Sequence, residues 1–470
     1  MEPRRLRLYN TRTRRKEPFE PLEPGHARVY SCGPTVYSRQ HLGNMRPYVF
    51  ADLLVRALRR QGLRVTWVVN VTDVGHLTDD ADAGEDKMER AAARTGRRAD
   101  EIAEEYTRLW QADLKRLHVS PPDVLCRATH HIAQQIEMIR RLEAKGVTYR
   151  IPDGVYFDTS KFPRYAELAR LDLEGQAGGQ RIGDVEGKRN PQDFALWKFA
   201  EPGVQRQQEW DSPWGRGFPG WHIECSAMST HYLGERFDIH TGGVDHLPVH
   251  HTNEVAQSET ALDVHPWVNV WMHEEFLDFQ DRKMSKSTGN VLDLDDLEAR
   301  GRLPLSFRYF LLQAHYRKQQ TFSDEAMEAA DRGYRRLLRS AAGLREADGQ
   351  PESARMEPWR ERFERAVCDD LNAPRALAVA TEVVRHEELP APERRALLED
   401  FDAWLGLGLL SEPLPEEAHD CDPRIEGLLA EREAARQRRD FAEADRIRDT
   451  LAREGVAIED TPEGPRWRRS

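Results

Sequence analysis

The sequence predicts an α/β fold in its first two thirds and a helical fold after it, and three observations support this. Strand and helix signals alternate through the N-terminal third, a hairpin signal interrupts them near residue 150, and strand signals fade beyond about residue 320. Alternation of this kind is typical of a parallel sheet covered by helices, whereas helical signals alone are typical of a bundle. A chain of 470 residues is long enough for several such domains.

The first predicted unit is a strand, a helix and a second strand. Residues 27–31 have strand composition and end at Cys32. Apolar residues then recur at helical spacing over residues 50–58, and Gly62 is placed to stop the helix. Residues 65–69 form a second apolar run. Such a unit predicts parallel pairing of the two strands.

The later segments predict an insertion, a bundle and a small terminal unit. Residues 147–157 are expected to form a hairpin that turns at Asp153-Gly154, and Ser323 is expected to cap a bundle helix. After a linker rich in Pro, Glu and Asp, two short helices and a hairpin predict a small α+β unit. The expected division is 1–118 and 201–305 for the two halves of the sheet domain, 119–200 for the insertion, 306–415 for the bundle and 416–470 for the terminal unit.

Composition limits the kind of protein. With 39% hydrophobic and 32% charged residues and no apolar run of membrane-spanning length, we expect a soluble protein without a membrane partner. The N-terminus has no apolar core typical of a secretory signal. Five scattered cysteines favour a reducing cytoplasm over a disulfide framework. The formal charge of −12 means that basic contacts to any RNA partner must be local.

Two motifs suggest a site for a nucleotide polyphosphate. His41-Leu42-Gly43-Asn44 lies between the first strand and its helix, where free backbone N–H groups and the helix dipole favour phosphate. Alone, this motif is weak evidence, and a histidine that caps the helix is the favoured explanation. The second motif, Lys283-Met284-Ser285-Lys286-Ser287, combines two ammonium groups and two hydroxyls beside a glycine. A lysine run is usually solvated surface, but its combination with the first motif favours a loop that closes on polyphosphate.

A third set of residues suggests a metal site. Cys32 precedes the first motif, Cys225 lies within Gly220–Met228, and His250 and Glu254 are spaced to share one face of a helix. Two thiolates, an imidazole and a carboxylate are a plausible zinc set. The spacing alone leaves buried thiols and a core histidine as the alternative, and it leaves other residues able to compete as ligands. These are His222, Glu224, His246 and His251.

The motifs together resemble those of the class I aminoacyl-tRNA synthetases, and the longer segments resemble the cysteinyl-tRNA synthetases. The first motif has Leu42 and Asn44 where the name-giving tetrapeptide has Ile and His. The segments that resemble the narrower family are Tyr30–Tyr37, Asn190–Lys198, Gly220–Met228 and Met284–Asn290. The resemblance implies a Rossmann-type catalytic domain with an inserted subdomain, then a helical bundle of the DALR type and an anticodon-recognition unit.

The resemblance also implies roles for individual residues. His41, Asn44, Lys283 and Lys286 would stabilise charge on the reacting phosphate, and His41, Gly43, Asn44 and Lys286 would contact ATP. One zinc ion per chain would be bound by Cys32, Cys225, His250 and Glu254. The cysteine pocket would include Thr72, Trp221 and Asp245, and the anticodon would contact Arg436, Asp445 and Asp460.

The function implied is ATP-dependent activation of L-cysteine to cysteinyl-adenylate, with Mg2+, and transfer to tRNA(Cys) by a cytoplasmic monomer. Zinc would separate cysteine from serine, because it binds thiolate far better than a neutral hydroxyl. Two alternatives stay open at this point. One is a ligase that joins cysteine to a small amine, as in mycothiol synthesis, although such ligases lack the terminal unit. The other is a non-catalytic paralogue that only binds tRNA.

Overall fold

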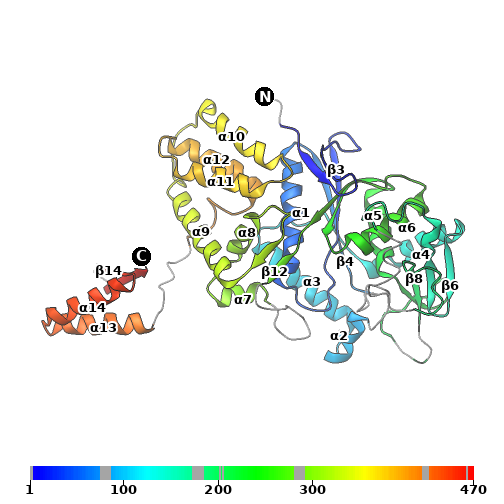
Figure 1. Cartoon of the computed structure of the whole chain (residues 1–470), viewed down its shortest axis with the longest axis horizontal. Helices are drawn as coiled ribbons and strands as arrows, with labels where there is room; N and C mark the ends of the chain where they lie inside the picture. The colour runs from blue at the N-terminus through cyan, green and yellow to red at the C-terminus, as the bar shows by residue number, and fades with distance from the viewer. Residues whose placement is uncertain are drawn as a thin grey trace. The chain divides into compact units, whose positions relative to one another are not determined.

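The computed structural model describes residues 4–74, 86–171, 185–200, 203, 206–279, 292–414, 423–461 and 464–469. The chain separates into two compact units, Met1–Glu412 and Pro413–Ser470, which are treated one at a time below (Figure 1). No helix among the described residues is both long and apolar enough to span a membrane.

Within the described residues, a parallel sheet of five strands forms the centre of the first unit, with the strand order β11-β10-β3-β4-β5. The predicted parallel pairing is confirmed: Val29 lies opposite Trp67 in the β3–β4 register. The strand order reverses between β3 and β10, so their carboxyl ends border a topological switch point, where open α/β sheets bind ligands. The strands are β3 (His26–Ser31), β4 (Arg64–Val71), β5 (Val124–Arg127), β10 (Phe237–Gly243) and β11 (Val268–Glu274).

Helix α1 (Leu42–Arg60) connects β3 to β4 and is almost wholly buried on its apolar side. It begins eight residues before the first apolar residue used to predict it, because His41 takes the N-cap position and opens the helix there. In Figure 1 the helix runs alongside the strands of the sheet. The other helices that connect the sheet are α2 (Lys87–Thr95), α3 (Ala99–Arg116), α4 (Ile132–Ala144), α5 (Trp221–Leu233) and α6 (Thr252–Leu262).

An antiparallel sheet, in the order β6-β7-β8-β9 among the described strands, lies between β5 and β10 in the chain. The predicted hairpin is confirmed, since Ile151 pairs with Gly154 across the turn. Its core is aromatic: Phe157 and Phe194 stack with ring centroids 5.1 Å apart. The strands are β6 (Thr148–Ile151), β7 (Gly154–Phe157), β8 (Phe194–Phe199) and β9 (Gly217–Pro219).

The last part of the first unit is helical, as predicted. Ser323 caps α9 (Asp324–Ala342) by accepting a hydrogen bond from the backbone of Ala326. Phe363 and Phe401 stack inside the bundle with centroids 4.0 Å apart. The remaining helices are α7 (Leu294–Ala299), α8 (Pro304–Leu312), α10 (Ser353–Val367), α11 (Ala373–Arg385) and α12 (Ala391–Leu405). Two short pairs, β1 (Arg7–Asn10) with β2 (Arg15–Pro18) and β12 (Leu277–Phe279) with β13 (Gln320–Phe322), complete the unit.

The second unit contains the two helices and the hairpin that the sequence predicts. Asp440 caps the second helix through the backbone N–H of Glu443. The unit has its own small core, formed by Ile425, Leu429, Ile447, Leu451, Val456 and Trp467. Its elements are α13 (Pro423–Gln437), α14 (Phe441–Arg453), β14 (Val456–Thr461) and β15 (Gly464–Arg469).

Candidate active site and metal centre

A pocket of about 480 Å³ opens at the carboxyl edge of the parallel sheet, beside the switch point between β3 and β10. It brings together residues from the first motif and most of those from the third set. The predicted site residues in its lining are Cys32, His41, Gly43, Asn44, Thr72, Trp221, Cys225, Asp245 and His250. Segments more than 200 residues apart in sequence therefore meet in one cavity.

The four predicted metal ligands converge. One ligand atom from each of Cys32, Cys225, His250 and Glu254 lies within 4.8 Å of the other three. Cys32 directly follows β3, and Cys225 lies in the second turn of α5. His250 belongs to a short π-helical turn that runs into α6, so it and Glu254 share one face, with Nε2 of His250 2.9 Å from Oε1 of Glu254.

The donor set fits a metal cation. Oε1 of Glu254 is fully buried and has no hydrogen-bond partner among the described residues, although it lies close to His250. This buried carboxylate oxygen requires a cation beside it, either the imidazolium of His250 or a metal ion. Sulfur, imidazole nitrogen and carboxylate oxygen are the ligands that zinc uses in proteins.

A group of buried histidines surrounds this set. Nε2 of His240 lies 2.9 Å from Oε2 of Glu254, and Nε2 of His251 lies 3.4 Å from Sγ of Cys32. A second combination, Cys32, His240, His251 and Glu254, therefore also has its ligand atoms within 4.8 Å of one another. Of the competing residues considered from sequence, only His251 belongs to this combination. Outer partners of this kind orient the ligands of metal sites.

The charges in the set balance one another. Burial disfavours the imidazolium of His250, but Glu254 and Cys225 outweigh this effect and raise its pKa to about 10. Burial likewise opposes ionisation of Glu254, yet His240 and His250 lower its pKa to about 2. The hydrogen bond from Cys32 is the main cause that lowers the pKa of Cys225 to about 6, while burial raises the pKa of Cys32. Near neutral pH, Cys225 is therefore a thiolate and Glu254 a carboxylate, while Cys32 and His250 carry protons that a metal cation can replace.

The first motif forms the N-terminus of α1. His41 is the N-cap residue, and Asn44 accepts a hydrogen bond from the His41 backbone N–H at 3.2 Å through its Oδ1. The capping role and the pocket position therefore occur in the same residues. The backbone N–H of Leu42 donates to the carbonyl oxygen of Leu292, so the segment just after the second motif is fixed to this helix start. Lys283 and Lys286 themselves lie outside the described residues.

Three further predicted residues lie around the pocket. Thr72 follows β4, and its hydroxyl accepts a hydrogen bond from Asn70 at 3.1 Å. Trp221 begins α5 and packs against His250, with ring centroids 4.3 Å apart. Asp245 follows β10 at the same edge of the sheet. The pocket thus combines a metal-ligand set, a hydroxyl, an aromatic wall and a carboxylate with a helix N-terminus.

The predicted anticodon residues belong to the second unit. Arg436 lies in the last turn of α13 and Asp445 near the start of α14, and both side chains are exposed. Each forms an ion pair within its own helix, Arg436 with Glu433 and Asp445 with Arg448. Asp460 is placed in β14 opposite Pro465, and its side chain lies outside the described part of the structure.

Sequence reasoning missed several polar residues of the site. His240 and His273 lie on β10 and β11, and Glu274 lines the pocket at the end of β11. Burial raises the pKa of Glu274 to about 8, an effect that Asp245 strengthens. The available signal was a pair of polar residues that alternate with apolar ones, Asp238 and His240 beside Phe237 and Ile239.

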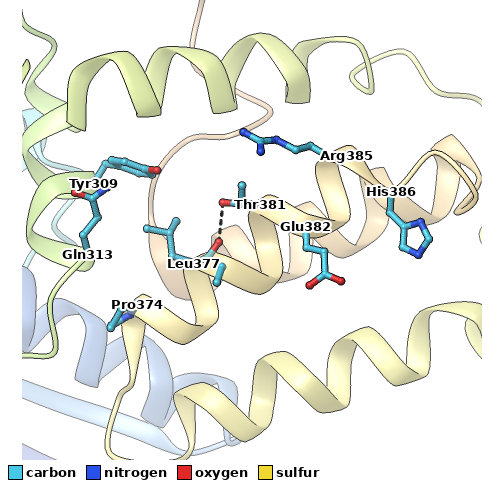
Figure 2. A pocket seen from close by; sticks show the side chains of 9 residues that line it. Tyr309, Gln313, Pro374, Leu377, Thr381, Glu382, Arg385 and His386 are labelled. Carbon is cyan, nitrogen blue, oxygen red and sulfur yellow. Dashed lines mark hydrogen bonds between the residues drawn. The ribbon is translucent and has the colours of Figure 1, made fainter. Parts of the chain in front are cut away.

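A second cavity of about 710 Å³ lies within the helical bundle, between α8 and α11 (Figure 2). Thr381 faces it and donates its hydroxyl to the carbonyl oxygen of Leu377 at 2.8 Å. The cavity is larger than the first, but it includes no member of either metal-ligand combination and no helix N-terminal motif. Its lining is Tyr309, Gln313, Pro374, Leu377, Ala378, Thr381, Glu382, Arg385 and His386.

Two family profiles match the chain. One, described as the tRNA synthetases class I (C) catalytic domain, matches residues 18–332. The other, described as the cysteinyl-tRNA ligase anticodon binding domain, matches residues 418–468. Between them they cover the parallel-sheet domain with its insertion and nearly all of the second unit.

Curated relatives match over almost their full length. The chain is 49% identical to "Cysteine--tRNA ligase 1" of Burkholderia lata, over 98% of this chain and 96% of the relative. It is 46% identical to the cysteine–tRNA ligase of Novosphingobium aromaticivorans, over 98% and 97%. The Thermus thermophilus cysteine–tRNA ligase is 43% identical, over 98% and 99%.

Solved structures with low sequence identity share the fold. A methionyl-tRNA synthetase of Mycobacterium tuberculosis, bound by methionyl-adenylate, has a TM-score of 0.54 at 17% identity, over 83% of this chain and 92% of that one. The LeuRS of Agrobacterium radiobacter K84, in a ternary complex with tRNA and LeuAMS, has a TM-score of 0.59 at 12% identity, over 84% and 87%. These likenesses confirm the predicted α/β class of the catalytic domain.

Proposed function

Since the chain belongs to the cysteine–tRNA ligase family of class I aminoacyl-tRNA synthetases, we propose that it activates L-cysteine with ATP and transfers it to the 3′ end of tRNA(Cys). The products would be L-cysteinyl-tRNA(Cys), AMP and diphosphate. One observation supports this most strongly: a single pocket is lined by Cys32, Cys225 and His250 of the metal-ligand set and by the helix N-terminus of the first motif. Residues suited to binding a thiol and residues suited to binding a phosphate therefore line the same pocket, as the binding of an aminoacyl-adenylate requires.

The metal is proposed to be zinc, one ion per chain, held by Cys32, Cys225, His250 and Glu254. Support comes from the convergence of these four residues and from the buried oxygen of Glu254 that lacks a hydrogen bond. Zinc, when bound, supplies a Lewis acid that favours a thiolate over a hydroxyl. The protein's own contribution is a rigid setting, because His240 fixes one oxygen of Glu254 and Trp221 packs on His250.

The nucleotide is proposed to bind at the start of α1. His41, Gly43 and Asn44 line the pocket there, and the positive end of the helix dipole favours phosphate oxygens. Lys283 and Lys286 are proposed to approach the same phosphates, with Mg2+ accompanying ATP. The hydrogen bond between Leu42 and Leu292 supports this, because it anchors one side of the lysine segment at the helix start. Their role would be to stabilise charge that develops at the α-phosphate.

The amino acid is proposed to lie among Thr72, Trp221 and Asp245. The Thr72 hydroxyl offers an oxygen to the α-ammonium group, and Trp221 closes the side near His250. In the second unit, Arg436, Asp445 and Asp460 are proposed to contact anticodon bases, whose edges are exposed in an unpaired loop. The match of residues 418–468 to an anticodon-binding family supports that assignment.

We also propose a monomeric enzyme that works in the cytoplasm. The described cysteines are free and buried, which suits a reducing compartment. We propose that the sheet domain comprises residues 1–118 and 201–305, the insertion residues 119–200, the bundle residues 306–415 and the terminal unit residues 416–470.

The experiment that tests this function is cysteine-dependent exchange between ATP and radiolabelled diphosphate. We expect exchange with cysteine, very little with serine, and loss of exchange after treatment with a zinc chelator. Re-addition of zinc should restore it. Exchange that proceeds equally with serine would contradict recognition through the metal. Exchange without any charging of tRNA(Cys) would instead favour a cysteine ligase that acts on a small amine.

A further inference from the structure

Beyond the pairing of β3 with β4, the loop after β3 is one residue longer than the loop after β4 before the two chains pair again. Ser31 lies opposite Val69, and the next bridge joins Thr35 to Thr72. The chain therefore advances four residues on the first side and three on the second. The extra residue lies in the loop after β3, beyond the strand pairing, so the backbone N–H of Gly33 needs a partner other than a neighbouring strand.

The Asn70 side chain fills this gap. The backbone N–H of Gly33 donates to Oδ1 of Asn70 at 2.8 Å. Asn70 is 1% exposed and Gly33 is half-buried, so the bond supplies the loop N–H group with a partner inside the protein. The fit is close: a Cβ atom at Gly33 would overlap the carbonyl oxygen of Asn70.

The nitrogen of the same Asn70 amide group binds the side chain of Thr72. Nδ2 of Asn70 donates to the Thr72 hydroxyl at 3.1 Å, and Thr72 is only 3% exposed. The Thr72 backbone is fixed as well, because its N–H donates to the carbonyl oxygen of Pro34 at 3.0 Å. The Thr72 side chain is therefore held by Asn70 at a position where Thr72 lines the pocket.

From this geometry we propose that Asn70 is a positioning residue for amino-acid recognition, which holds the Thr72 hydroxyl at a fixed place relative to the Cys32 loop. The inference rests on the proposed function, in which the thiol end of cysteine is read near Cys32 and its ammonium end near Thr72. One planar amide joins the two anchors, because its oxygen binds the residue next to Cys32 and its nitrogen binds Thr72. Asn70 acts through these two residues and needs no contact with the phosphates.

This role predicts a specific kinetic pattern. Loss of one buried hydrogen bond to a substrate-binding group costs about 1–1.5 kcal/mol, which corresponds to roughly a tenfold change in an equilibrium constant. Asn70→Ala should therefore raise the KM for cysteine roughly tenfold in diphosphate exchange, while the KM for ATP changes less than about twofold. A loss of folded enzyme would lower kcat and leave both KM values unchanged. A rise in the KM for cysteine alone therefore distinguishes a positioning role from a role in stability.

A double-mutant cycle tests whether Asn70 acts through Thr72. Thr72→Ala, Asn70→Ala and the double variant are compared by kcat/KM for cysteine. The double variant should be little worse than Thr72→Ala alone, because the hydroxyl that Asn70 positions is already absent. Fully additive effects would overturn the inference, and so would an unchanged KM for cysteine in Asn70→Ala.

Two further variants distinguish a loss of positioning from misfolding. Asn70→Asp keeps the acceptor for Gly33 but replaces the amide donor, so it should retain zinc, measured by elemental analysis, and still raise the KM for cysteine. Asn10→Ala is the matched control: Asn10 is equally buried and donates to the carbonyl oxygen of Asn269 at 3.0 Å, yet it does not line the pocket. It should lower stability without changing either KM.

If the wild type itself shows no cysteine-dependent exchange, the proposed function fails. If the wild type is active but the effects of the variants are additive, only the role of Asn70 is refuted.

Discussion

The guanidinium of Arg308 and the carboxylate of Asp52 form an ion pair at 2.6 Å, and both side chains are completely buried. Asp52 lies on α1 and Arg308 on α8, so the pair joins the helix that begins at His41 to the helical bundle. Arg308 also donates to the carbonyl oxygens of Leu405 and Leu117. The guanidinium therefore makes hydrogen bonds through all three of its nitrogens, as a buried charge requires.

Removing one partner of this pair should be strongly destabilising. Asp52→Asn would leave the Arg308 charge buried without a counter-ion, which costs about 3–5 kcal/mol. The measurement is urea unfolding followed by circular dichroism. Arg365→Ala provides the control, because Arg365 pairs with Glu361 on an exposed helix face, and its loss should cost less than about 0.5 kcal/mol. Equal effects of the two variants would show that burial of the Asp52–Arg308 pair has no energetic importance.

Replacing Cys32 by serine should reduce metal content and cysteine activation together. The hydroxyl is a much weaker ligand than a thiolate, and three remaining ligands hold zinc less tightly. We expect the zinc per chain, measured by elemental analysis, to fall well below that of the wild type. Cys126→Ser is a suitable control, because Cys126 is also a buried free cysteine but belongs to neither ligand combination. Full zinc content in Cys32→Ser would exclude Cys32 as a ligand.

Glu274 should make the protein less stable as the pH rises. Burial is the main cause that raises its folded pKa to about 8, from an ordinary value of 4.5. Between these values the folded chain holds a proton that the unfolded chain releases, so stability falls with increasing pH through this window. Glu274→Gln should remove the effect, which we expect to be on the order of 2 kcal/mol between pH 5 and pH 8.

The measurement for Glu274 is the melting temperature as a function of pH. The neighbouring Glu275→Gln removes a carboxyl group from a less buried position and serves as the control; it should shift the profile only slightly, because Glu275 is the smallest of the causes given for the raised pKa of Glu274. Parallel pH profiles for wild type and Glu274→Gln would contradict the assignment of a neutral carboxyl at this site.

Lys286→Ala should lower the rate of adenylate formation much more than it weakens cysteine binding. The ammonium group is needed where phosphate charge develops in the transition state, so kcat should fall by roughly a hundredfold or more. Diphosphate exchange at saturating cysteine and ATP measures this. If turnover stays intact, Lys286 is solvated surface and the phosphate must be stabilised by other groups.

Deleting residues 416–470 should abolish charging of tRNA(Cys) and spare cysteine-dependent exchange. The second unit has its own core, and the pocket is formed entirely by residues of the first unit. Arg436→Ala in the full chain is the finer test, expected to raise the KM for tRNA and leave exchange unchanged. A truncated protein that still charges tRNA at the full rate would refute the anticodon role of this unit.

Local patterns were enough to predict the main elements. The β3–α1–β4 unit, the hairpin at Asp153 and the cap at Ser323 each depend on a few neighbouring residues, so their physical causes are visible in sequence. The position of Cys225 beside Cys32 depends instead on how α5 packs on the sheet. Residue chemistry could suggest that pair, and the family resemblance was needed to select it.

Other features could not be predicted from one sequence. His240 is one of three buried polar residues of β10, with Asp238 and Thr241, and its contact with Glu254 arises only when β10 and α6 pack together. The role of Asn70 depends on a one-residue offset between two loops, and such an offset follows from strand register, which local composition does not determine.

The closeness of Gly33 to the Asn70 carbonyl also limits how this enzyme can be redesigned. Gly242 is similarly restricted, because a Cβ atom there would lie 2.6 Å from the ring of His251. In random libraries that vary the whole pocket wall, most variants would carry a side chain at Gly33 or Gly242 for which the neighbouring atoms leave no room. A search for variants that accept enlarged or unnatural thiol amino acids is therefore better confined to Trp221 and Thr72, with both glycines held constant.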